Sequence, residues 1–102
     1  MTYLYLKADI YPDLSKREEV EAAYAELMRA SLAEAGCLLY DLVVDPENPN
    51  VWHMLEKWES RDAWNDHMQT THVAKIRQLE PSLVIAPTVL NFYTSALSPA
   101  DR

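Results

Sequence analysis

Three side chains in the second half of this sequence could move protons: Glu56, His67 and His72. Glu56 is expected to face Tyr40 across a β-hairpin, in an apolar neighbourhood that includes Trp58. Loss of hydration in such a place raises the pKa of a carboxyl group, which would let Glu56 act as a general base or acid near neutral pH. The alternative is a structural glutamate held by Tyr40, by a backbone donor or by an arginine of a partner subunit.

The two histidines flank an expected helix break. His67 shares a helix face with Trp64 and Met68, so its ring should point towards a sheet, where an imidazole suits proton transfer. A core histidine with a satisfied hydrogen bond would occupy the same place. His72 should cap or line the break after Thr71, and the alternative for it is an ordinary residue at a helix start.

Tryptophans could provide the walls of a binding cavity. Trp52, Trp58 and Trp64 could line a flat cavity for an aromatic ligand, although plain core positions are the alternative. Cys37 enters a strand without a clear histidine partner, so no thiol nucleophile is expected.

Several other chemistries are not expected. The chain has one glycine, so a glycine-rich phosphate loop is absent. His67 and His72 are five residues apart, which differs from the i, i+4 spacing of a helical metal pair, and no Cys-x-x-Cys occurs, so no metal site is predicted. The net charge of −7 argues against nucleic acid as a partner.

The pattern of apolar residues predicts a β-α-β-β-α-β order, which is the ferredoxin-like α+β arrangement of an antiparallel sheet with helices on one face. The helices are expected to begin at a Ser15–Glu18 capping box and at Ser60. Gly36 should form the C-cap of the first helix. The expected elements are a strand at 3–11, a helix at 15–35, strands at 37–45 and 51–59 around a loop at 46–50, a helix from 60 that breaks at 70–71, a second piece at 72–79 closed by Pro81, and an edge or bulged strand at 83–94 that contains Pro87.

The hairpin has two faces of different character. One face should carry the pairs Leu38–Trp58, Tyr40–Glu56, Leu42–Met54 and Val44–Trp52. The other is half apolar and carries Cys37, Leu39, Asp41, Val43, Val51, His53, Leu55 and Lys57. Because helices can cover only one face, the second indicates a partner subunit and therefore a homodimer. Scattered surface aliphatic residues would be the ordinary alternative.

Length and composition fit one domain. The 102 residues are 49% hydrophobic and 25% charged, and we expect one domain at 1–96 with a flexible tail at 97–102. A single cysteine, no recognisable leader and no apolar run of about 20 residues favour a cytoplasmic protein without a membrane span.

The segment from Ala35 to Ile76 resembles the antibiotic-biosynthesis-monooxygenase family, and within it the small quinol-monooxygenase-like proteins. The resemblance rests on Gly-Cys-x-x-Tyr at 36–40, Glu-x-Trp-x-Ser at 56–60 and His-x4-His at 67–72. It implies a dimeric α/β barrel with a pocket between each sheet and its helices. Some members oxidise phenolic or quinol-like substrates with O2 and use no metal, haem or flavin. The resemblance makes Glu56, Trp58, His67 and His72 pocket residues; the hairpin pairing adds Tyr40 and the tryptophan pattern adds Trp64. The catalytic candidates are Glu56 and His67, and the substrate-binding candidates are Tyr40, Trp58, Trp64 and His72.

Two other functions remain open from the sequence. One is an isomerase of a small phosphorylated, sugar-like metabolite, which would need a cation from among Lys7, Lys57, Lys75 and Arg77. The other is a non-catalytic dimeric ligand-binding domain. Haem degradation is disfavoured because His67 and Arg77 stand where that branch is expected to carry tryptophan and histidine.

Overall fold

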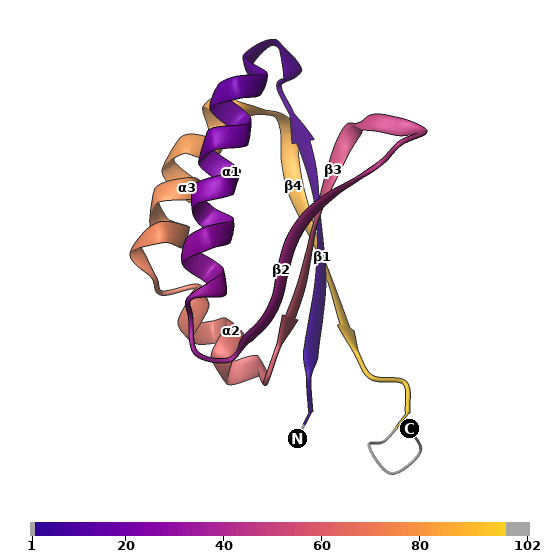
Figure 1. The fold of residues 1–102 in the computed structure, drawn as a ribbon, viewed down its shortest axis with the longest axis vertical. Helices are drawn as coiled ribbons and strands as arrows, with labels where there is room; N and C mark the ends of the chain where they lie inside the picture. The colour runs from indigo at the N-terminus through magenta and orange to yellow at the C-terminus, as the bar shows by residue number, and fades with distance from the viewer. Residues whose placement is uncertain (1, 98–102) are drawn as a thin grey trace.

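The computed structural model describes residues 2–97 and has the predicted β-α-β-β-α-β order. The strands form one antiparallel sheet in the order β2-β3-β1-β4, and the helices lie together on one of its faces (Figure 1). This confirms the ferredoxin-like α+β fold. The elements are β1 (Leu4–Pro12), a 3-10 turn (Leu14–Lys16), α1 (Arg17–Leu32), β2 (Cys37–Asp45), β3 (Asn48–Trp58), α2 (Arg61–His67), α3 (Thr71–Leu83) and β4 (Val84–Thr94). The predicted tail at 97–102 lies outside the described residues except for Leu97.

Alternation along the central strand β1 decides which face of the sheet becomes the core. Leu4, Leu6, Ala8 and Ile10 point towards the helices, and each exposes no more than 5% of its surface. The strand on one side of β1, β4, is an edge strand, and its pairing with β1 shifts register near Pro87. An edge position or a bulge was expected, because proline has no N–H for the ladder, and the strand has both an edge position and an irregularity.

The first helix begins differently from the prediction. Asp13, and not Ser15, caps the turn before α1: its Oδ1 accepts bonds from the Ser15 N–H at 3.1 Å and the Ser15 hydroxyl at 2.6 Å. The Ser15–Glu18 capping box is therefore wrong. A carboxylate that accepts two local donors competes with the hydroxyl for the role of cap.

The hairpin register is largely as predicted. Tyr40 pairs with Glu56, and the two pairs further along the hairpin, Leu42–Met54 and Val44–Trp52, also form. The Leu38–Trp58 pair is wrong, because a register shift between Cys37 and Leu39 places Cys37 opposite Trp58. Cys37 consequently packs against the core and Leu38 is exposed.

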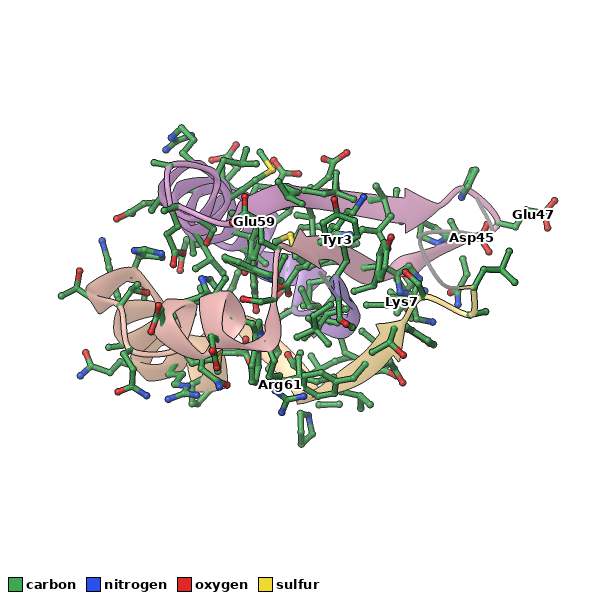
Figure 2. All side chains as sticks on the ribbon, turned by 90° about the horizontal axis from the view of Figure 1, so that it is seen from below. Tyr3, Lys7, Asp45, Glu47, Glu59 and Arg61 are labelled. Atoms are coloured by element: carbon green, nitrogen blue, oxygen red, sulfur yellow. The ribbon has the colours of Figure 1, made fainter. Side chains whose placement is uncertain are left out.

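The hairpin turn is shorter than the predicted loop at 46–50, because β3 already begins at Asn48. Figure 2 shows Asp45 and Glu47 at this tip, away from the helices. The tip therefore takes no part in the helical layer.

The second half of the helical layer breaks where expected and ends later than expected. The Thr70 hydroxyl caps α3 by accepting from the Val73 N–H at 3.3 Å. Pro81 does not close the helix, which continues to Leu83 and ends with the Val84 N–H bonded to the Glu80 carbonyl. A proline in the last turn removes only one bond of the ladder, so the helix tolerates it there.

The outer face of the sheet has a polar centre and apolar flanks. Asp9 accepts from His53 Nδ1 at 2.7 Å and from the Asn91 amide at 2.9 Å. Beside this centre, Leu39, Val89 and Tyr93 each expose more than 40% of their surface. Of the helices that the structure describes, none has the length and apolar character required to cross a membrane.

Gly36 controls the approach of α2 to the turn before β2. It does not directly cap α1, which ends at Leu32, but its φ of +85° is in the left-handed region. A Cβ added there would lie 2.8 Å from the Cβ of Ala63. The position therefore requires glycine both for its backbone conformation and for its contact.

We predict that Gly36→Ala lowers the free energy of unfolding by roughly 2–4 kcal/mol, from the strained φ and the clash together. Urea unfolding of the single variants and of the double variant Gly36→Ala/Ala63→Gly separates the contribution of the strained φ from that of the clash. Ala63→Gly should recover part of the loss in the double variant, and strict additivity would contradict the steric contribution.

Candidate active site

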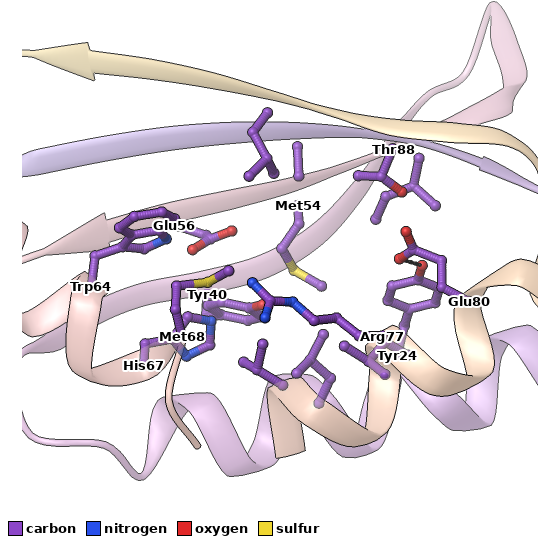
Figure 3. Close-up of a pocket in the computed structure, with 16 residues that line it drawn as sticks. Tyr24, Tyr40, Met54, Glu56, Trp64, His67, Met68, Arg77, Glu80 and Thr88 are labelled. Atoms are coloured by element: carbon purple, nitrogen blue, oxygen red, sulfur yellow. Dashed lines mark hydrogen bonds between the residues drawn. The ribbon is translucent and has the colours of Figure 1, made fainter. Parts of the chain in front are cut away.

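A cavity of about 220 Å³ lies between the inner face of the sheet and the three helices (Figure 3). Its walls are mostly apolar, and its polar side chains come from every layer. The apolar lining residues are Ala8, Ile10, Leu27, Met54, Met68, Val73, Ile76 and Leu90; the others are Tyr24, Tyr40, Glu56, Trp64, His67, Arg77, Glu80 and Thr88. A 150 Å³ apolar cavity holds benzene, so this one has the size for a single substituted ring.

Glu56 brings a carboxyl group into this cavity. It occupies an inward position of β3 and exposes 6% of its surface, and Figure 3 shows its carboxyl group among the lining side chains. The pKa of Glu56 is raised to about 7, mainly by burial. The bond from Trp58 Nε1 to Glu56 Oε1 at 2.9 Å opposes the rise, and the charge of Glu34 adds to it. Glu56 therefore exchanges protons near neutral pH, as a general base or acid must.

Tyr40, Trp58 and His67 form an aromatic group beside Glu56. The His67 ring lies 4.6 Å from that of Trp58 and 5.4 Å from that of Tyr40. Trp58 is fully buried and supports Glu56 from behind without lining the cavity itself. Burial raises the pKa of Tyr40 well above its ordinary value, so its phenol stays protonated and can hydrogen-bond a ligand.

Glu34 holds both histidines and was missed in the sequence. Its Oε2 accepts from His67 Nδ1 at 2.5 Å and from His72 Nε2 at 2.8 Å. His67 lines the cavity, whereas His72 does not, so the substrate-binding role predicted for His72 receives no support from the geometry. Burial lowers the pKa of His67, and the nearby Glu34 carboxylate acts in the opposite direction.

The helix break explains why the histidines meet. Five residues along one continuous helix would separate them by about 140° around the axis. His67 instead ends α2 and His72 lies in the first turn of α3, so both rings reach Glu34, beyond the C-terminal end of α1. Because the two histidines lie on different helices, the i, i+4 spacing of a helical metal pair does not decide whether they can share a metal ion.

The rest of the cavity carries one cation and a carboxylate–phenol pair. Arg77 extends from α3 into the cavity, and the Tyr24 hydroxyl donates to Glu80 Oε2 at 2.7 Å at the far end (Figure 3). Trp64 also lines the cavity, with its ring 5.1 Å from that of Phe92. Of the four cations considered for a phosphate, Arg77 is the one on the cavity wall.

Trp52, which the sequence offered as a cavity wall, and Cys37, which it did not favour as a nucleophile, both lie outside the cavity lining. Trp52 is a core residue outside the cavity lining, with the guanidinium of Arg17 5.9 Å from its ring. Burial raises the pKa of Cys37 to about 11, which keeps this side chain a thiol at neutral pH. Neither residue therefore contributes to the candidate site.

Glu56 should make stability depend on pH. The folded-state pKa of Glu56, about 7, exceeds the ordinary value of 4.5. The contribution of this side chain to the stability of the fold is therefore fully present below about pH 4.5 and is lost as the pH rises through 7. We predict that Glu56→Gln matches the wild type near pH 4.5 and is more stable at pH 8.5 by on the order of 3 kcal/mol. Urea unfolding at both pH values measures this, with the exposed hairpin-tip change Glu47→Gln as control. Equal effects of the Glu56 change at both values would contradict it.

Comparison with known proteins identifies the family. The model of the antibiotic biosynthesis monooxygenase family matches residues 4–79. The chain is 36% identical over 80 residues to the Bacillus subtilis protein named "Putative monooxygenase YcnE", covering 74% of this chain and 84% of that one. The crystal structure of a conserved Methanosarcina mazei protein has a TM-score of 0.86 at 26% identity, over 91% of this chain and 92% of that one. The crystal structure of a Pseudomonas aeruginosa protein has a TM-score of 0.85 at 28% identity, over 95% of this chain and 97% of that one. This chain belongs to the antibiotic biosynthesis monooxygenase family.

Proposed function

We propose that the protein is a cofactor-independent monooxygenase that oxidises a small, single-ring quinol or polyphenol with O2 in the cavity beneath the sheet. The observation that carries the proposal is a buried carboxyl group with a pKa of about 7 in a cavity with the size for one aromatic ring. Family membership and the name of the Bacillus subtilis relative support the same class of reaction.

Glu56 would begin the reaction by accepting a phenolic proton. An ionised ring is a better electron donor than the neutral phenol, and it transfers one electron to O2 to give a ring radical and superoxide. Their recombination forms a carbon–oxygen bond. Loss of water then leaves a hydroxylated quinone, so that quinol and O2 become hydroxyquinone and water. The substrate supplies all the electrons for this sequence.

Three neighbours would assist Glu56. Arg77 places a positive charge in the cavity, which stabilises the ring anion among mostly apolar walls. Tyr40 offers a neutral hydroxyl for a second ring oxygen. His67 has its Nδ1 bonded to Glu34, so Nε2 is the nitrogen left for the substrate. Trp64 covers one end of the cavity.

Arg77 also supports a second candidate function. A cation in the same cavity as a carboxyl group with a pKa near 7 could bind the phosphate of a small keto–enol metabolite while Glu56 moves a proton between carbons. Lys7 and Lys57 lie on the outer face of the sheet, so Arg77 is the one cation left of these to bind that phosphate. The cavity therefore suits a phosphate less well than it suits an aromatic ring, which its aromatic walls can contact.

We also propose that two copies pack through the outer faces of their sheets, as the α/β barrel of the family resemblance implies. The exposed flanks on either side of the polar centre, Leu39 on β2 and Val89 and Tyr93 on β4, supply apolar area. The polar centre at Asp9 and His53 would fix the relative orientation of the two sheets.

We predict that the wild type consumes O2 with single-ring quinols faster than autoxidation, and that Glu56→Gln lowers kcat by about 10²–10⁴-fold because the proton acceptor is lost. The oxygen electrode measures uptake across a panel of quinols and anthrone-like phenols, with Glu47→Gln as the matched exposed control and His67→Ala as a second site variant. The activity should rise as the pH increases through an apparent pKa near 7, where Glu56 becomes ionised.

The panel also separates the alternatives. Uptake no faster than autoxidation for every substrate would reject the quinol assignment. Proton exchange into a keto–enol phosphate ester would then support the isomerase, and saturable binding without turnover would support a ligand-binding domain.

For the assembly, we predict that the wild type sediments as a dimer and that Val89→Asp shifts it to the monomer, because a buried unpaired charge opposes association. Sedimentation velocity measures this. Leu79→Asp, on an exposed position of α3, should leave the dimer intact. A wild type that stays monomeric at high concentration would contradict the proposal.

A further inference from the structure

We propose that Glu34, His67 and His72 form a binding site for one divalent transition-metal cation. Their ligand atoms, one from each side chain, lie within 4.8 Å of one another. Glu34 Oε2 is 2.5 Å from His67 Nδ1 and 2.8 Å from His72 Nε2. The three come from separate segments of the chain, so the fold itself brings them together.

The spacing of the ligand atoms is close to that of a coordinated ion. Zinc lies about 2.0–2.2 Å from imidazole nitrogen and carboxylate oxygen, so neighbouring ligands of a tetrahedral ion are about 3.3 Å apart. Opening the two hydrogen bonds to that separation requires shifts of less than about 1 Å, and the two imidazole nitrogens, which lie within 4.8 Å of each other, must come to about the same separation. The ion would replace the two N–H protons that now face Glu34.

The surroundings hold the ligands while leaving the ion accessible. The ring of His67 packs against Trp58 and Tyr40, and the Thr70 hydroxyl donates to the His67 carbonyl at 2.7 Å. The side chains of Glu34 and His72 are 14% and 18% exposed, which gives an ion a route from solvent. Water can complete the coordination on that side, as in metal sites with three protein ligands.

The donor set selects the class of metal. Two imidazoles and one carboxylate suit Zn²⁺, Co²⁺, Ni²⁺ or Fe²⁺, whereas Mg²⁺ and Ca²⁺ prefer oxygen ligands alone. The site lies behind the cavity wall and plays no part in the electron transfer proposed above. It therefore goes beyond the proposed function and can be tested without a substrate.

Metal binding would change the group that His67 presents to the cavity. With Glu34 accepting from Nδ1, the neutral imidazole keeps a lone pair on Nε2. With a metal on Nδ1, the remaining proton must lie on Nε2. The cavity would then meet a hydrogen-bond donor in place of an acceptor, so occupancy of the site would alter which ring substituent binds there.

The test is titration of untagged protein with Co²⁺ and Zn²⁺. We expect one ion per chain, visible Co²⁺ absorption bands of a low-symmetry N/O site, and displacement of Co²⁺ by Zn²⁺. Glu34→Gln and His72→Ala should each weaken Zn²⁺ binding by at least about tenfold. Two matched controls, Glu26→Gln on α1 and His53→Ala on the outer face, should leave the affinity within about twofold of the wild type.

Nitrogen NMR of the histidine rings gives an independent readout. Zn²⁺ should move the His67 proton from Nδ1 to Nε2 and leave His53 unchanged. No saturable binding, or binding that both Glu34→Gln and His72→Ala leave intact, would overturn the proposal. Because none of these measurements uses turnover, failure of the metal site and failure of the monooxygenase proposal are distinguishable.

Discussion

The register of the β2–β3 hairpin determines what lies beneath the sheet. Inward positions of β3 carry Met54, Glu56 and Trp58, and Tyr40 of β2 faces Glu56 across the ladder. A slip of one residue would exchange this set for Leu55 and Lys57. The register thus places one carboxyl group in an apolar layer, and burial there raises its pKa into the range useful for proton transfer.

Trp58 links the cavity to the histidine cluster behind it. Its indole N–H donates to Glu56, and its ring packs against His67, which in turn bonds Glu34. The carboxyl groups of Glu56 and Glu34 are also coupled by charge, because Glu34 raises the pKa of Glu56. A change at the cluster, such as neutralisation of Glu34 by a cation, would therefore reach the proton acceptor in the cavity without moving the sheet.

Alternating and helical periodicities predicted the four strands and three α-helices of the described residues but not the 3-10 turn, and hairpin pairing placed Tyr40 opposite Glu56. These periodicities failed where neighbouring residues do not differ in polarity. Cys37, Leu38 and Leu39 are all apolar, so alternation cannot reveal the register shift there. The cap of the first turn was assigned to Ser15 because spacing alone does not show that Asp13 accepts two bonds.

The candidate site was predictable only in part, for a related reason. Glu56 and His67 stand out by type and periodicity, and both line the cavity. Glu34 was missed because its partners lie more than 30 residues away, and a glutamate near a helix end reads as an ordinary surface residue. The grouping of His67 with His72 depends on the angle between α2 and α3, which local spacing does not encode.

Everything proposed for the cavity depends on the raised pKa of one buried carboxyl group, Glu56. A carbon-13 NMR titration of the glutamate side chains, with the Glu56 signal assigned by its absence in Glu56→Gln, measures that pKa directly. We expect Glu56 to titrate near 7. Titration near the ordinary 4.5 would contradict the account, because Glu56 would then be an ordinary ionised glutamate at neutral pH with no tuning by the fold.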